Sequence, residues 1–236
     1  MIYAHHQILR FGICIKNHLS KYPIKGHVDE IGYNSGMKRL QDSGRAKRIS
    51  KMMSIKDKNL QDILNIEKSF YSNITIEQYY KKASYAILKE TRNHKEKAVI
   101  FNKNGEILLE KLGNEESIVF SQNELQKLKD GYLIHNHPTG STLSEADINL
   151  ALYYDLKEIV AFSSKGVFYR LKIKNNANSK EIMIQYKKSK MKVLSIMAKV
   201  YKSGGLTKEQ IDMEVNYLIV AHFAKNSKGV KYEISN

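Results

Sequence analysis

Cysteine is nearly absent from this chain, since Cys14 is the only one among 236 residues. A single cysteine excludes a disulfide bond within the chain and fits a reducing compartment. It also excludes a cysteine-rich zinc site, which leaves histidine and carboxylate side chains as metal ligands. We therefore expect a cytoplasmic protein, and its length is enough for one sizeable hydrophobic core or two small ones.

Long apolar runs are absent as well. No stretch reaches the length of about 18 apolar residues that a membrane-spanning helix needs. The apolar patch from Ile8 to Ile15 is interrupted by Arg10, and it has neither a basic region before it nor a clear small-residue cleavage site after it. The sequence therefore predicts no membrane span, no signal peptide and no membrane partner.

The net charge of the chain is +15. Acidic residues are scarce in its N-terminal and C-terminal flanks, but not in the segment between them. Residues 1–83 carry 15 basic and 7 acidic side chains, and residues 173–236 carry 12 and 5. Residues 84–172 carry 12 of each, so the middle is neutral. Basic flanks can bind nucleic acid through its phosphates, with a strong dependence on salt. The alternative is that these lysines are simply solvated.

The segment HNHPTGSTLSEAD, residues 135–147, carries the clearest chemical signal. His135 and His137 are expected to end a short strand, and residues two apart on a strand point to the same face. Pro138 ends the strand because it has no N–H for the sheet. Ser144 then begins a helix, with Asp147 in its first turn. Two imidazoles and a carboxylate are a ligand set that suits a catalytic metal site.

A purely structural interpretation also accounts for each of these residues singly. Ser144 and Asp147 have the spacing of a capping box, in which a Ser and an acid three residues later satisfy the first turn of a helix. The two histidines can be a polar strand end. That interpretation does not explain why the histidines, the proline turn and the capped acid occur together, so we favour a metal site.

These residues resemble the JAMM (MPN-plus) metalloproteases, whose motif is His-x-His-Pro followed by Ser-x-x-Asp. The spelling HNHP is most similar to the bacterial RadC-like and phage or mobile-element branches, and the resemblance covers roughly residues 76–173. It implies that His135, His137 and Asp147 hold Zn²⁺, and that Ser144 helps to stabilise the oxyanion. It also implies a bacterial, phage or mobile-element origin.

The family uses a glutamate upstream of the motif, and two residues compete for that role. Glu96 precedes the apolar run 98–101, which ends at the turn signal Asn104-Gly105, and in the RadC-like branch the glutamate leads into such a hairpin. Glu90 falls at the end of a predicted helix. We therefore assign the base to Glu96, whose other interpretation is an exposed acid in a charged run.

One departure from the family concerns the loop after Pro138. Five residues, 139–143, separate Pro138 from Ser144, one fewer than the commonest family spacing. Surface loops vary easily in length, so we expect Asp147 to reach the metal. The alternative is a metal-free copy of the fold.

Hydrophobic periodicity and turn signals predict an α/β (α+β) fold, with a mixed β-sheet flanked by helices, similar to the JAMM and cytidine-deaminase fold. We expect a basic, irregular N-terminal segment (1–54), a JAMM-like domain with leading helices (55–175) and a basic helical hairpin (176–236). Helices are expected at about 55–70, 75–91, 121–130, 144–156, 180–202 and from 207; strands are expected near 97–102, 106–112, 132–137, 159–162 and 167–173.

The function that these observations predict is a zinc-dependent peptidase or isopeptidase acting on a protein or peptide. Glu96 would take the proton of a zinc-activated water and pass it to the leaving amine. Two alternatives remain open: a RadC-like module that binds nucleic acid through its basic flanks, and a metal-free interaction scaffold. The substrate and the oligomeric state are not encoded in any pattern that we recognise.

Overall fold

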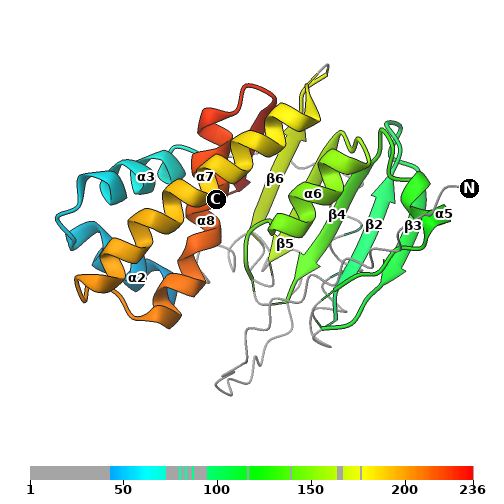
Figure 1. Cartoon of the computed structure of the whole chain (residues 1–236). Helices are drawn as coiled ribbons and strands as arrows, with labels where there is room; N and C mark the ends of the chain where they lie inside the picture. Colours follow the sequence, from blue (N-terminus) through cyan, green and yellow to red (C-terminus); the bar gives the residue numbers. More distant parts are fainter. Residues whose placement is uncertain are drawn as a thin grey trace, which may run out of the picture.

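The computed structural model describes residues 43–72, 80, 83, 87, 95–115, 117–138, 140–163, 167–175 and 177–235. Figure 1 shows a twisted sheet with helices packed on it and a group of helices beside it. The elements, in chain order, are α2 (Ser43–Ser54), α3 (Lys58–Lys68), β1 (Tyr71–Ser72), β2 (Lys97–Phe101), β3 (Ile107–Leu112), α5 (Gln122–Gln126), β4 (Tyr132–His137), α6 (Glu145–Tyr153), β5 (Glu158–Ser163), β6 (Phe168–Ile173), α7 (Ser179–Lys202), α8 (Lys208–Asn226) and β7 (Val230–Ser235). The predicted mixed α+β class is confirmed.

The strands form one mixed sheet in the order β1-β7-β6-β5-β4-β2-β3. β4 and β5 are parallel, as are β1 and β7, and the other neighbouring pairs are antiparallel. Two parallel neighbours need a crossover connection, which α6 supplies between β4 and β5. β4 therefore lies inside the sheet, between β2 and β5, with the start of a helix close to its carboxyl end.

The side chains of β5 show why the sheet is covered on both faces. Ile159 and Ala161 belong to the main core with the helices, whereas Val160 and Phe162 belong to a second cluster on the other face. This alternation is the two-residue period of a strand. Tyr80, Ala83 and Ile87 are helical, buried and part of that second cluster. They fall within the helix predicted at 75–91, most of which lies outside the described residues.

Local signals in the sequence predicted several boundaries correctly. The hairpin of β2 and β3 turns at Gly105, whose φ of 79° suits glycine. Capping boxes begin α5 at Ser121, α6 at Ser144 and α8 at Thr207, each with both reciprocal hydrogen bonds. The capping box expected at residues 75–78 lies outside the described residues.

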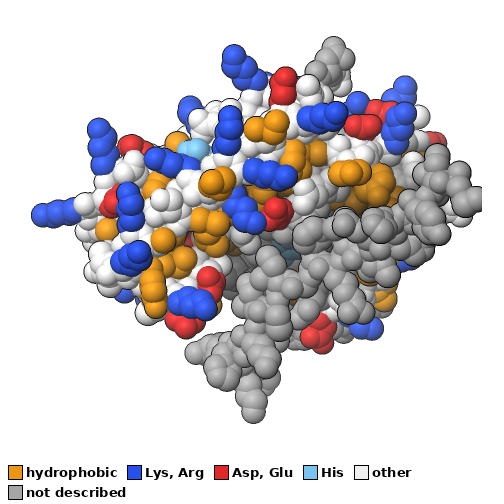
Figure 2. Space-filling model, in the orientation of Figure 1, with side chains coloured by type: hydrophobic (Ala, Val, Ile, Leu, Met, Phe, Trp, Pro, Cys, Tyr) orange, Lys and Arg blue, Asp and Glu red, His pale blue; other side chains and the backbone are white. Residues whose placement is uncertain are grey.

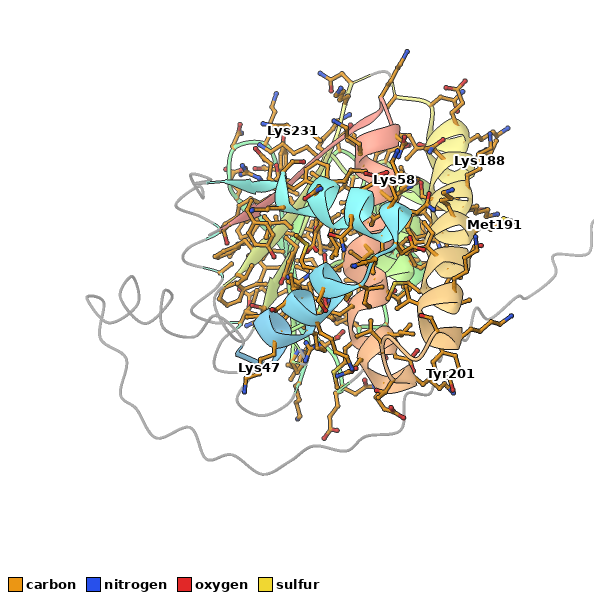
Figure 3. The ribbon with its side chains drawn as sticks, turned by 90° about the vertical axis from the view of Figure 1, so that its left-hand side faces the viewer. Lys47, Lys58, Lys188, Met191, Tyr201 and Lys231 are labelled. Atoms are coloured by element: carbon orange, nitrogen blue, oxygen red, sulfur yellow. The ribbon has the colours of Figure 1, made fainter. Side chains whose placement is uncertain are left out.

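The predicted division into three parts does not correspond to separate cores. Residues 43–54 were expected to be irregular, and this was wrong, because they form α2. Residues 176–236 were expected to be a helical hairpin only, but they also supply β7, which extends the sheet beyond β6. Side chains from α2, α3, the sheet, α7 and α8 share one hydrophobic core. Figure 3 shows α2 and α3 lying against α8, with Met191 and Tyr201 on α7 pointing away from the molecule.

The positive charge of the flanks lies partly on the surface of α7. This helix contains seven lysines and a single acid, Glu181. Figure 2 shows lysine and arginine side chains spread over this face of the molecule, among hydrophobic and acidic ones. Within the described residues, no helix has both the length and the apolar character that a membrane crossing requires.

Candidate metal centre

Strand β4 holds His135 and His137 on one face at its carboxyl end, as their spacing predicted. Both side chains are buried, and their Nε2 atoms lie 2.8 Å apart. Their rigidity follows from the sheet, because β4 is paired on both sides: His135 lies opposite Ala98 of β2 and Ala161 of β5. Two imidazole nitrogens are therefore presented together from a strand that is paired on both sides.

Asp147 completes a group of three from the first turn of α6. Its Oδ1 lies 3.0 Å from His135 Nε2, and its Oδ2 lies 3.4 Å from His137 Nε2. The short loop after Pro138 thus brings Asp147 to the histidines, as expected. The three ligand atoms lie within 4.8 Å of one another, and this group can hold a metal ion.

The hydrogen bonds around His137 favour a cation between these groups. Its Nδ1 lies 3.1 Å from the carbonyl oxygen of Ser141. The Ser141 hydroxyl lies 3.0 Å from the same nitrogen. A carbonyl can only accept, so in the tautomer in which Nδ1 donates to it, Nε2 of the neutral ring keeps its lone pair. That lone pair faces the carboxylate of Asp147, also an acceptor. In that tautomer the converging acceptors need a cation between them, either a proton or a metal ion.

His135 adds a second observation of the same kind. Its Nδ1 is buried and has no hydrogen-bond partner among the described residues. Among the described residues, the polar contacts of its ring that are established lie on the Nε2 side, with His137 and Asp147. The nitrogen and oxygen set, with His137 oriented by a backbone carbonyl, fits the way in which proteins prepare metal-binding histidines.

The charges of the group are strongly coupled. Burial raises the pKa of Asp147, but the two adjacent imidazoles outweigh it and hold this pKa well below its usual range. Burial lowers the pKa of His137, but Asp147 and then Glu96 outweigh it and raise this pKa to about 9. Without a metal, the group therefore retains a proton that a metal ion must displace.

Glu96 lies directly before β2, where the hairpin was predicted to begin. Its backbone N–H donates to Asn114 O, and its carbonyl accepts from Gly113 N–H, both at 2.8 Å. Burial raises the pKa of its carboxyl group, and the neighbouring charges of His137, His135 and Asp147 also act on it. The carboxyl group of Glu96 is therefore close enough to interact with the charges of the three residues, and it is not part of their group. The competing Glu90 lies outside the described residues.

Ser144 contacts Asp147 rather than the histidines. Its hydroxyl donates to Asp147 Oδ2 at 2.7 Å, and its backbone N–H donates to the same oxygen at 2.6 Å. The capping interpretation of this pair is therefore confirmed, and it coexists with the metal interpretation because Oδ1 still faces His135. The oxyanion role of Ser144 stays a prediction.

Two residues near the centre were missed by the sequence reasoning. The side chain of Asn136 accepts from Lys97 N–H at 2.6 Å and donates to Lys95 O at 2.9 Å, so it holds the backbone on both sides of Glu96. Asn136 could have been found from the sequence, because an amide side chain within a buried strand must have hydrogen-bond partners. Ser141 was not detectable, since its contact with His137 depends on the conformation of the loop.

The chain was compared with protein-family models, with curated proteins and with solved structures. None of the three comparisons found a match. What is known of the centre is therefore its geometry: two strand-borne histidines, a helix-borne aspartate able to complete a metal site, and a glutamate beside them.

Proposed function

We propose that this protein is a zinc-dependent hydrolase of amide bonds, a peptidase or isopeptidase. The observation that carries the proposal is the convergence of His135 Nε2, His137 Nε2 and the Asp147 carboxylate beside a partly buried Glu96. Three protein ligands of this kind, with a carboxylate outside the ligand set, are the arrangement that hydrolytic zinc sites use. The resemblance of residues 135–147 to the JAMM motif supports the same assignment.

His135, His137 and Asp147 would hold the zinc ion. When bound, zinc supplies Lewis acidity, lowering the pKa of water toward neutrality and polarising a carbonyl group. Glu96 accepts a proton from the attacking water and delivers it to the leaving amine, because its carboxyl group lies next to the ligands but outside their group. The carbonyl oxygen of Ser141 can accept from Nδ1 of His137, and in that tautomer Nε2 is free to face the metal.

The proposal is tested by separating metal binding from catalysis. The Glu96→Gln variant is expected to keep its zinc, measured by elemental analysis, and to lose at least about 100-fold of its hydrolysis rate. The probes are fluorogenic peptides with an α-linked and an ε-linked (isopeptide) amide. Asp147→Ala is expected to lose both zinc and activity.

Matched controls are available on the same elements of the fold. Glu110→Gln changes an exposed glutamate of β3 that pairs with Lys97, and Asp212→Ala changes an exposed aspartate of α8. Both are expected to behave like the wild type. Full zinc content in Asp147→Ala, or unchanged hydrolysis in Glu96→Gln, would contradict the proposal.

A further inference from the structure

The loop that joins β4 to α6 is held by two tyrosines from the C-terminal part of the chain. The hydroxyl of Tyr217 on α8 donates to the carbonyl oxygen of Gly140 at 2.8 Å. The hydroxyls of Tyr232 on β7 and Thr142 lie 2.8 Å apart. Ser141 lies between these two attachment points, and its hydroxyl and carbonyl both contact His137 Nδ1. The position of the loop therefore sets the hydrogen bonding of one proposed metal ligand.

Tyr217 is in turn fixed by an arginine from the other end of the chain. The guanidinium of Arg45 on α2 lies over the ring of Tyr217, 3.7 Å from its centroid. A cation held against an aromatic face in this way is attracted to the ring. The same ring packs edge-on against Tyr169 of β6, with the centroids 5.7 Å apart. The ring therefore has one position, defined by α2 on one side and the sheet on the other.

Arg45 itself is buried, and each of its three side-chain nitrogens has a partner. Its Nε donates to Glu214 at 3.1 Å, one terminal nitrogen donates to Tyr71 at 2.6 Å, and the other is paired with Glu67. Arg48 also donates to Glu214, at 2.8 Å. A buried ion cluster is costly to desolvate, and well-packed apolar residues could stabilise the core equally well. Stability alone does not account for an arginine at this position.

We infer that Tyr217 is a positioning residue of the metal centre and that Arg45 acts through it. Arg45 places the ring, the hydroxyl of Tyr217 places Gly140, and the loop then places Ser141 against His137. Helix α2 lies far in sequence from residues 135–147, yet through Arg45 it would help to position a ligand of the metal site. The inference rests on the proposed function only in taking His137 as a metal ligand.

The first test is the Tyr217→Phe variant, which keeps the ring and its contact with Arg45 and removes only the hydroxyl. We expect its affinity for Zn²⁺, measured by competition with a chelator, to fall about tenfold, since partners that orient metal ligands have effects of this size. The visible spectrum of the Co²⁺-loaded protein should also change, because the environment of His137 changes. Wild-type affinity together with a wild-type spectrum would overturn the inference.

Tyr71→Phe is the matched control. It also removes a hydroxyl that contacts Arg45, but Tyr71 is not attached to the loop, and Arg45 keeps Glu67 and Glu214. Its metal affinity and Co²⁺ spectrum should equal those of the wild type. A loss as large as that of Tyr217→Phe would show that general damage to the cluster is responsible and would overturn the inference.

The second test asks whether Arg45 acts through Tyr217. Arg45→Lys keeps the charge but loses the planar fork that lies on the ring. In a double-mutant cycle, its effect on metal affinity should disappear in the Tyr217→Phe background, and additive effects would exclude this route. If the wild type binds no metal at all, the proposed function fails. If it binds metal and the variants are indistinguishable from it, only the positioning role fails.

Discussion

At the scale of single residues, the candidate centre relies on side chains that have two tasks each. Asp147 caps helix α6 through Oδ2 and faces His135 through Oδ1. Asn136 satisfies its own buried amide and also holds the backbone around Glu96. The three candidate ligands were predictable because their spacing is local, within 13 residues of sequence. Ser141 and Tyr217 were not predictable, because their contacts exist only after distant segments have packed.

Asn136 gives a prediction at this scale. Asn136→Ala should leave Lys97 N–H and Lys95 O without these partners and release the segment that carries Glu96. We expect the hydrolysis rate to fall by at least about tenfold while zinc is retained, and the free energy of unfolding to fall by about 1–3 kcal/mol. Zinc content, peptide hydrolysis and urea unfolding measure the three effects.

Asn123→Ala, at an exposed position of α5, is the control and should change none of these quantities. Hydrolysis at the wild-type rate in Asn136→Ala would show that the position of Glu96 does not depend on the hydrogen bonds of Asn136.

At the scale of elements, the sequence predicted those whose signals are local. The Asn104-Gly105 turn predicted the hairpin of β2 and β3, and the capping boxes predicted the starts of α5, α6 and α8. Helix α2 was missed because it is strongly basic, and the acids that neutralise it come from other helices, Glu67 from α3 and Glu214 from α8. Strand β1 was missed because two residues form a strand only through the partner that they pair with.

Strand β7 is a different case, because the sequence pattern that predicts a strand is present in it. In the segment VKYEIS, Val230, Tyr232 and Ile234 are buried and alternate with two charged residues. This is the two-residue period of a half-buried strand.

The attachment of β7 to β6 gives a prediction that depends on pH. Glu233 lies opposite Arg170 and accepts from it at 2.9 Å, and Lys231 also pairs with it. Burial raises the pKa of Glu233, but Lys231 and Arg170 outweigh it and hold this pKa below its usual range. The carboxylate therefore stabilises the fold above the unfolded-state pKa of about 4.3, and this contribution is lost as the pH falls through the lower, folded-state pKa.

Glu233→Gln should consequently lower the free energy of unfolding by about 2 kcal/mol at pH 7. The difference from the wild type should shrink as the pH is lowered into the acid range. Urea unfolding at several pH values measures this dependence. Glu110→Gln, which removes a half-exposed carboxylate from its pair with Lys97, should cost less than about 1 kcal/mol at any pH. A loss in Glu233→Gln that is independent of pH would contradict this account.

At the scale of the whole molecule, the described parts of the two basic flanks, α2 and α3 on one side and α7, α8 and β7 on the other, belong to one fold. Arg45 and Arg48 neutralise the buried Glu214, and Lys190 of α7 pairs with Glu145 of α6. Part of the flanking positive charge is thus used inside the protein. Binding of nucleic acid by the remaining lysines stays a prediction, whose signature is an affinity that falls steeply with salt.

This architecture predicts that the motif-bearing segment does not fold alone. Residues 55–175 lack α7, α8 and β7, so the core face of the sheet and the free edge of β6 would be exposed. We expect this fragment to show no cooperative urea transition, whereas the full chain shows one. A cooperative transition for the fragment, with zinc bound, would demonstrate an autonomous domain.

The packing of α3 against α8, and of β1 against β7, also has a consequence for biosynthesis. A ribosome completes α3 roughly 140–160 residues before it has made α8, an interval on the order of 10 s at about 5–20 residues per second. During this interval Leu60, Ile63 and Leu64 lack the surface that buries them in the finished protein. The nascent chain therefore presents an uncovered apolar helix while β4, the strand that carries His135 and His137, is still being synthesised. Early contact with a chaperone is expected at α3.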